Sequence, residues 1–190
     1  NKVQVTDTKT KKEEKTGHIV LEVPSFMAYS LRNFYATNTI LTNLHPDHLD
    51  WHKDVQEYYG AKLNLLAHTK ENIVYPESAL KNFPELSDFP LHALVLSDEL
   101  PLENNLLALS SEVFLDVSEK QLFGIHNIRN IYSAAMLSLR LGISVKTLSS
   151  ILPYITALPH RLQQISQKDE KIWIDDSKST TAQSLYAALT

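Results

Sequence analysis

The sequence predicts an α/β protein, with a mainly parallel sheet flanked by helices and the start of a second, truncated domain. Three runs of aliphatic and β-branched residues, at 36–44, 72–76 and 91–97, have the composition of buried strands. Two segments with helical periodicity, 54–69 and 126–142, alternate with these runs or follow them. Strands that alternate with helices favour parallel pairing, because each crossover helix returns the chain to the same edge of the sheet.

The first part of the chain supplies further elements. Residues 1–17 are polar and charged, and we interpret them as a loop or a ragged end. The apolar run HIVLEV at 18–23 predicts a strand, and SFMAYSLRNF at 25–34 predicts a short helix. Asp54 precedes the helix over 54–69 and is interpreted as its N-cap.

The middle of the chain has weaker strand signals and then two helices. A strand pair is expected at about 106–122. The helix over 126–142 ends with Gly142 in a C′-like position. The second helix, over 144–155, begins at Ser144, whose hydroxyl is expected to cap it.

A domain boundary is expected near 153–161, where two prolines bracket a short apolar link. Beyond it, the sequence predicts a hairpin that turns around Lys168–Glu170 and a helix that begins in 180–190. This tail is too short to fold alone. We therefore assign 18–157 to one domain and 158–190 to the beginning of another.

Composition excludes several classes of function. With 43% hydrophobic residues, 21% charged residues and a net charge of -4, the chain is typical of a globular protein without a general nucleic-acid surface. The absence of cysteine excludes disulfides, thiolate metal sites and thiol catalysis. No apolar run reaches the roughly 18 residues of a membrane span. A cytoplasmic location is the default expectation.

Glycine is scarce, and its positions limit how the chain could bind phosphate. The sequence holds four glycines, Gly17, Gly60, Gly124 and Gly142, and none opens a GxxxxGK[ST] or GxGxxG pattern. A loop of the chain's own that cradles phosphates is therefore not expected. The first residue is Asn1, which fits a fragment or a processed chain. The 190 residues by themselves are expected to be inactive.

Lys62 is a candidate functional residue because of its place on a predicted helix. At about 100° per residue, it falls inside the apolar arc formed by Tyr58, Tyr59, Leu63 and Leu66. A lysine on such a face is costly unless it is paired or modified. Two interpretations stay open: a lysine that extends to the rim of the core, or a functional lysine that faces the end of a neighbouring strand.

The segment LTNLHPDHLDWH, residues 41–52, places polar side chains directly after a predicted strand. Ligands bind beyond the carboxyl ends of parallel strands, and Glu22 ends another candidate strand at the same edge. Hard cations such as magnesium prefer oxygen ligands. The alternative is a polar loop; we interpret His52 as structural, and the histidine spacing is not a zinc signature. The candidate site residues are His45, Asp47, His48 and Asp50.

Two later motifs carry groups that suit a nucleotide. In HNIRN, His126, Asn127 and Asn130 stand on the first helical turn, where amides could bind an adenine edge or cap the helix. LPHR and DDSKSTT contribute an arginine and a lysine that suit phosphates, and an aspartate that suits a ribose hydroxyl. Their hydroxyl residues could bind a carboxylate or cap a helix. The residues concerned are Arg161, Asp176, Ser177, Lys178, Ser179, Thr180 and Thr181.

Taken in order, LEVPSF, TNLHPDHLDWH, YYGAKLNLL, GIHNIRNIYSAA, LPHR and WIDDSKSTT resemble the Mur ligases, the ATP-dependent amino-acid-adding enzymes of peptidoglycan synthesis. The resemblance spans about 18–190. It implies that 18–157 is the central, ATPase-like domain and that 158–190 begins a Rossmann-like C-terminal domain. It also implies a reaction in which ATP activates a substrate carboxylate as an acyl phosphate, which the incoming amino group attacks.

The resemblance also implies roles for individual residues. Lys62 matches a lysine that is carbamylated in the family, and with Glu22 and His48 it would hold Mg²⁺. His48 and Lys62 are therefore the expected catalytic residues. The other residues match ATP contacts on the adenine side (Asn127 and Asn130), ATP contacts at the domain junction (Arg161, Asp176 and Lys178) and substrate contacts (Thr180 and Ser25).

Within the family, Phe26 after Ser25 and the DSKST loop favour the branch that adds D-glutamate to UDP-N-acetylmuramoyl-L-alanine, expected here as a monomer. One alternative is a sister ligase: one that adds another amino acid, one that amidates muropeptides, or a folylpolyglutamate synthase. Another is a degenerate, non-catalytic nucleotide-binding domain. Pro24, where the family usually has serine, and the missing phosphate loop support the degenerate domain. The retained Glu22, His48 and Lys62 argue against it.

Overall fold

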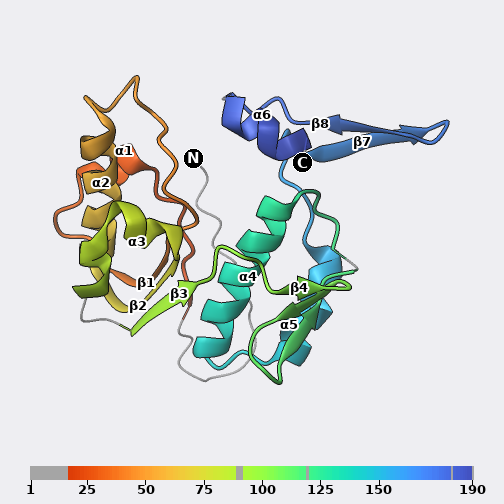
Figure 1. Cartoon of the computed structure of the whole chain (residues 1–190), viewed down its shortest axis with the longest axis horizontal. Helices are drawn as coiled ribbons and strands as arrows, with labels where there is room; N and C mark the ends of the chain where they lie inside the picture. Colours follow the sequence, from red (N-terminus) through yellow and green to blue (C-terminus); the bar gives the residue numbers. More distant parts are fainter. Residues whose placement is uncertain (1–16, 89–91, 119, 181, 190) are drawn as a thin grey trace. The chain divides into compact units, whose positions relative to one another are not determined.

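The computed structural model describes residues 17–88, 92–118, 120–180 and 182–189, so most of the predicted polar segment 1–17 lies outside it (Figure 1). The chain forms two compact units by its internal contacts. One consists of Asn1–Tyr35 with Pro46–His68, and the other of Ala36–His45 with Thr69–Thr190. The predicted domain boundary near 153–161 stays a prediction.

The first unit is built around helices α1 (Ser25–Tyr29) and α2 (Val55–Ala67), which pack against each other. The side-chain amide of Asn64 in α2 donates a hydrogen bond of 2.7 Å to the Ala28 carbonyl in α1. The predicted cap of α2 is confirmed, since the Asp54 side chain accepts a 2.9 Å hydrogen bond from the backbone N–H of Glu57.

The prediction of a strand at 18–23 was wrong. Residues 17–24 have no regular secondary structure, and Ile19 and Val20 are 69% and 89% exposed. A strand is stable only when its backbone groups pair with a neighbour, and no described strand pairs with this segment. The predicted helix at 25–34 forms but is shorter, because α1 ends at Tyr29.

The second unit contains the predicted parallel sheet. Strands β1 (Ala36–Ile40), β2 (Thr69–Pro76) and β3 (His92–Leu96) lie in the order β1-β2-β3, and both pairings are parallel. β1 is shorter than the predicted run 36–44. Polar bonds also join β1 to β2: the Asn72 amide donates to Asn38 Oδ1 at 2.6 Å, and the hydroxyls of Thr39 and Thr69 lie 2.6 Å apart.

Helices pack against this sheet, as the sequence predicted. Helix α3 (Ser78–Asn82) follows β2 and contacts it, and α4 (Ile125–Arg140) contacts both β1 and β2. A 3₁₀ helix at Pro84–Asp88 continues from α3. Ile73 and Val74 in β2 are almost completely buried, which fits a strand covered on both faces.

The strand pair expected at about 106–122 is instead a small antiparallel sheet of three short strands. These are β4 (Leu102–Glu103), β5 (Leu106–Ala108) and β6 (Phe114–Asp116). Asn104 and Asn105 form the turn between β4 and β5 with φ of 49° and 64°, values that asparagine tolerates better than most residues.

A core of aliphatic side chains joins this small sheet to two helices. The buried residues come from the sheet and its flanks, from α4, and from α5 (Val145–Ile151) with the 3₁₀ helix Leu152–Tyr154 that follows it. They are Leu107, Leu109, Leu115, Val117, Ile128, Ile131, Ala135, Leu148 and Leu152. The burial of their apolar surface is the main force that holds α4 in place.

The predicted C-terminal end of α4 and the predicted cap of α5 are confirmed, although α5 ends at Ile151 and a 3₁₀ turn follows it within the predicted range 144–155. Gly142 follows α4 with φ of +83°, and its backbone N–H donates to the Leu139 carbonyl at 3.0 Å. Such left-handed residues commonly end helices, because they let the chain turn while the last carbonyls stay bonded. Ser144 caps α5: its hydroxyl accepts a 3.1 Å hydrogen bond from the backbone N–H of Thr147.

The last part of the chain forms the predicted hairpin and helix. Strands β7 (Gln163–Lys168) and β8 (Lys171–Asp175) pair antiparallel, and α6 (Ala182–Leu189) follows. Both residues of the two-residue turn, Asp169 and Glu170, have positive φ, which is the conformation of a type I′ hairpin turn. The hairpin and α6 are the blue elements of Figure 1.

Candidate functional site

Lys62 lies on α2 in a partly buried position. Its Nζ is 4.9 Å from the centre of the Tyr58 ring, where the ring's negative face attracts a cation. Burial lowers the pKa of Lys62, and the Asp47 carboxylate opposes this by raising it. Burial therefore favours the neutral form of the amine, and the nearby Asp47 anion favours its charged form.

The Tyr58 hydroxyl belongs to the same surroundings. Burial raises its pKa to about 12, and the negative charges of Asp47 and ionised Tyr59 add to that effect. Tyr58 therefore remains a neutral phenol at any physiological pH. Asp47, Tyr58 and Lys62 form one electrostatic group within the first unit.

His48 is held at the surface in a backbone conformation that few residues adopt. Its φ is +54°, and its backbone N–H donates to Asp47 Oδ1 at 2.8 Å. Its Nε2 lies 3.8 Å from Asp47 Oδ2, and its ring meets the edge of Phe26 with the centroids 5.7 Å apart. A left-handed residue beside candidate functional groups is a feature often found at sites, and the half-exposed imidazole can reach a ligand.

His52 and Ser25 lie in the interior of the first unit. Each is 2% exposed, and His52 Nε2 shares a 2.8 Å hydrogen bond with Ser25 Oγ. His52 Nδ1 is 3.5 Å from a carboxylate oxygen of Glu57, which also accepts a 2.9 Å bond from the Lys53 N–H. These contacts agree with the structural interpretation of His52. A substrate contact by Ser25 stays a prediction, and it would require Oγ to share or release its bond to His52.

Glu22 lies in the exposed segment before α1, within the same unit as His48 and Lys62. Across the described ranges, no three His, Cys, Asp or Glu side chains gather closely enough to hold a metal ion. The predicted magnesium ligands are different in kind, since one of them would be a carbamylated lysine. Their metal role therefore stays a prediction.

The candidate adenine residues begin α4 in the second unit. The Asn127 side-chain amide donates a 2.7 Å hydrogen bond to the Phe123 carbonyl, so its nitrogen serves the local backbone and leaves its oxygen for other partners. Asn130 is exposed one turn later. The His126 ring lies against Gly124, whose φ is +82°, and a Cβ added to Gly124 would be 2.5 Å from that ring.

The structure brings Arg161, Asp176 and Lys178 together at one end of the β7–β8 hairpin. Asp176 Oδ1 accepts a 3.0 Å hydrogen bond from the Leu162 N–H, and the Lys178 N–H donates to the His160 carbonyl at 3.1 Å. The side chains of Arg161 and Lys178 are exposed, so two cations are presented beside one partly buried carboxylate.

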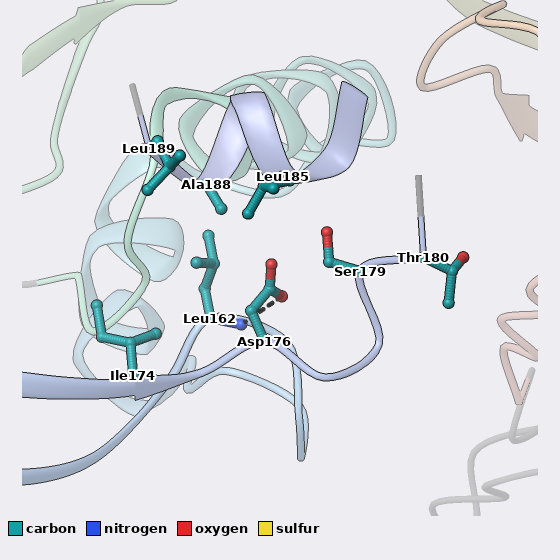
Figure 2. A pocket seen from close by; sticks show the side chains of 8 residues that line it. All are labelled: Leu162, Ile174, Asp176, Ser179, Thr180, Leu185, Ala188 and Leu189. Carbon is teal, nitrogen blue, oxygen red and sulfur yellow. Dashed lines mark hydrogen bonds between the residues drawn. The ribbon is translucent and has the colours of Figure 1, made fainter. Parts of the chain in front are cut away.

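Asp176 also lines an open cavity of about 530 Å³ (Figure 2). Ser179 and Thr180 line it from the loop before α6, and the Ser179 hydroxyl is buried without a hydrogen-bond partner among the described residues. Aliphatic side chains from the hairpin region and from α6 form the apolar wall of the cavity. They are Leu162, Ile174, Leu185, Ala188 and Leu189. The cavity thus combines one carboxylate and two hydroxyls with an aliphatic surface.

Sequence reasoning missed a pair of residues in this region. His160 Nδ1 lies 2.7 Å from Asp175 Oδ2, and hydrogen bonds from His160 and Ser177 lower the pKa of Asp175 to about 2. Both residues stand directly beside predicted ATP contacts, in LPHR and in DDSK. The two adjacent aspartates were the available signal, but only folding showed that the first pairs with His160.

Comparison with known proteins gives the class to which these features belong. Residues 1–86 match the family model of the Mur ligase middle domain. The chain is therefore similar to the Mur ligases, most directly over these residues.

Its relatives include two enzymes named UDP-N-acetylmuramoylalanine--D-glutamate ligase. The one from Streptococcus sanguinis is 28% identical over 197 residues, which cover 98% of this chain and 42% of that enzyme. The one from Haemophilus influenzae is 31% identical over 177 residues, which cover 90% of this chain and 40% of that enzyme. The chain thus spans about two fifths of the length of these curated relatives.

Solved structures show the same fold. The MurF ligase from Thermotoga maritima in complex with ADP matches with a TM-score of 0.64 and 16% identity, over 87% of this chain and 41% of that chain. The UDP-N-acetylmuramate-alanine ligase MurC from the same organism matches with a TM-score of 0.62 and 18% identity, over 88% and 39%. Among the described residues, no helix is both long enough and apolar enough to cross a bilayer.

Proposed function

We propose that the protein is an ATP-dependent ligase of peptidoglycan synthesis that adds D-glutamate to UDP-N-acetylmuramoyl-L-alanine. The observation that carries this proposal is that Asp47 acts on both Lys62 and His48, within the part of the chain that matches the Mur ligase middle domain. The choice of amino acid is supported by relatives named as D-glutamate ligases, which match over 90% or more of this chain. Residues 18–157 would form the central domain and 158–190 the beginning of the C-terminal domain.

The reaction joins a carboxylate to an amine. The carboxylate attacks the γ-phosphorus of ATP, ADP leaves, and an acyl phosphate forms. The neutral amino group of D-glutamate then attacks the acyl carbon, the C–O bond to phosphate breaks, and the nitrogen loses a proton, so that phosphate leaves and an amide bond remains. Both steps concentrate negative charge on phosphoryl oxygens, so positioning and charge stabilisation are the main tasks of the protein.

The donor set on the first unit fits a magnesium ion. Glu22 offers a carboxylate, His48 an exposed imidazole, and Lys62 would add two oxygens as a carbamate. Carbamates form from neutral amines, and burial shifts Lys62 toward that form. Magnesium bound there would offset the charge of the transferring phosphoryl group.

The remaining residues would bind the nucleotide and the amino acid. Asn127, through its side-chain oxygen, and Asn130 would contact adenine, while the two exposed cations of the hairpin end would contact phosphates. Thr180 and Ser25 would contact substrate. The hairpin residues in this assignment are Arg161 and Lys178 for phosphates and Asp176 for the ribose. The proposal also includes that the protein is a monomer and that it works in the cytoplasm, where ATP is available.

Phosphate release by the full-length protein tests this function. The assay contains ATP, magnesium and UDP-N-acetylmuramoyl-L-alanine, with D-glutamate, with L-glutamate or without an amino acid. Release that depends on D-glutamate is expected. Release that depends on another amino acid would replace the substrate but keep the reaction. No release from a folded protein under any of these conditions would overturn the proposed ligase.

A further inference from the structure

Arg161 stands between two residues whose backbones adopt the left-handed region. His160 has φ of +66° and Leu162 has φ of +44°. Histidine tolerates this region better than most residues, but leucine adopts it rarely, so the conformation is strained. The chain bears this strain only where neighbouring contacts fix the backbone. The conformation on both sides of Arg161 is therefore imposed by its surroundings.

Two adjacent aspartates provide those contacts. Asp175 Oδ2 lies 2.7 Å from His160 Nδ1, and Asp176 Oδ1 accepts a 3.0 Å hydrogen bond from the Leu162 N–H. The first aspartate thus holds the residue before Arg161, and the second holds the residue after it. Figure 2 shows the bond that the Leu162 N–H donates to Asp176. Leu162 is also buried, which anchors that side of the turn.

Further bonds fix the frame around these contacts. Asp175 Oδ1 accepts a 3.0 Å bond from the Ser177 N–H, so the carboxylate is held at both oxygens. The Lys178 N–H donates to the His160 carbonyl at 3.1 Å, and the His160 N–H donates to Gln163 Oε1 at 3.1 Å. His160 is thus bonded through its ring, its N–H and its carbonyl.

The guanidinium of Arg161 takes part in none of the bonds that hold this turn, and its side chain is exposed. A planar guanidinium binds phosphate oxygens well only when it approaches in the correct orientation. A backbone fixed on both sides sets the direction in which the Arg161 side chain leaves the chain, so binding has less freedom to remove. The strained turn is thus suited to present Arg161 to an anion.

We propose that His160 and Asp175 are positioning residues that orient Arg161 toward the phosphates of the bound nucleotide. This inference rests on the proposed function, because it takes Arg161 as a phosphate contact. Asp175 does not touch the nucleotide in this arrangement. It acts through the His160 ring on the backbone of the arginine.

The test is ADP binding by the full-length protein, measured by calorimetry in Asp175→Ala and His160→Asn. Asparagine tolerates positive φ, so His160→Asn removes the imidazole with little added strain. Both variants are expected to bind ADP about tenfold more weakly or worse, because a small misplacement of a binding group is costly. Asp175→Asn keeps an acceptor for His160 and should lie between the wild type and Asp175→Ala.

A double-mutant cycle with Arg161→Ala separates positioning from general damage. If Asp175 acts through Arg161, Asp175→Ala adds no further loss of ADP affinity once Arg161 is gone. Asp169→Asn, in the turn at the opposite end of the same hairpin, is the matched control and should bind ADP like the wild type. Circular dichroism and thermal unfolding verify that each variant is folded.

The outcomes distinguish this inference from the proposed function. Additive losses in the cycle, or unchanged affinity in Asp175→Ala, would overturn the positioning role even in an active ligase. A non-additive cycle in a protein without amino-acid-dependent phosphate release would support the positioning role and overturn the ligase. A folded wild type that does not bind ADP would overturn both.

Discussion

Lys62 is the residue whose loss should be most severe. Lys62→Ala removes the amine that would become a magnesium ligand, so ligation by the full-length protein is expected to fall by more than the roughly 10- to 100-fold typical of outer-shell contacts. Added bicarbonate should not restore it, because alanine has no amine to modify. The measurement is phosphate release at saturating substrates. Lys146→Ala, an exposed lysine on α5, is the control, and normal turnover by Lys62→Ala would contradict the metal role.

His52 should contribute to stability. His52→Ala removes a buried ring and leaves the Ser25 hydroxyl without its 2.8 Å partner, so the free energy of unfolding should fall by about 2–4 kcal/mol. Urea unfolding measures the change. His18→Ala, at an exposed position, should change it by less than about 0.5 kcal/mol. An equally stable His52→Ala variant would show that the buried bond contributes little.

Asp175 should titrate at an unusually low pH. Hydrogen bonds from His160 and Ser177 lower its pKa from 3.8 to about 2, so the folded state binds this proton more weakly than the unfolded state. The stabilisation is therefore complete above the unfolded value and is lost as the pH falls through about 2. A carboxyl NMR titration should give a midpoint near 2 in the wild type and no such signal in Asp175→Asn. An ordinary midpoint in the folded protein would exclude this pairing.

At the scale of single elements, Gly124 and Gly60 are expected to respond in opposite ways to replacement by alanine. Gly124 precedes α4 with φ of +82°, and an added Cβ would be 2.5 Å from the His126 ring. Gly124→Ala should lower the free energy of unfolding by more than about 1 kcal/mol, since alanine is strained at this φ and the ring must move. Thermal unfolding measures the loss.

Gly60 is the control with the opposite sign. It lies within α2, and an added Cβ would meet nothing within 4 Å. Gly60→Ala should therefore raise the free energy of unfolding by about 0.5–1 kcal/mol, because alanine loses less backbone entropy in a helix. The same sign of change in both variants would contradict this account.

The helices and the later strands follow from local signals. Asp54 and Ser144 cap the helices that they precede in the sequence, and Gly142 ends α4. These signals are strong because each satisfies backbone groups within a few residues of itself. The hairpin turn at Asp169–Glu170 is equally local, since two residues with positive φ suffice to reverse the chain.

At the scale of the whole molecule, hydrogen exchange should separate paired from unpaired apolar segments. Amides of β2 around Ile73 and Val74 should exchange slowly, because they are buried and paired on both sides. Amides of 18–23 should exchange rapidly, because no described strand pairs with that segment. Mass spectrometry of peptides from both segments makes the comparison within one sample. Equal protection would show that 18–23 pairs as a strand in solution.

The sequence indicated the properties of single candidate residues but not the contacts between them. The apolar arc of α2 indicated that Lys62 would be partly buried, and the structure agrees. Asp47 is the carboxylate whose charge acts on Lys62, and in the sequence it was one of several acidic residues that could have done so. Distance between side chains decides which carboxylate matters, and sequence spacing does not give that distance across a loop.

The sequence by itself determined the α/β class, the parallel strands, the helix ends and the hairpin, because periodicity, caps and turns act over a few residues. Tertiary structure decided whether HIVLEV pairs as a strand, because a strand needs a neighbour that its own residues cannot supply. It also decided that Asp175 holds His160 and that Asp176 holds Leu162, on the two sides of Arg161. Those bonds join residues 14 or 15 positions apart, and only the paired strands of the hairpin bring them within reach.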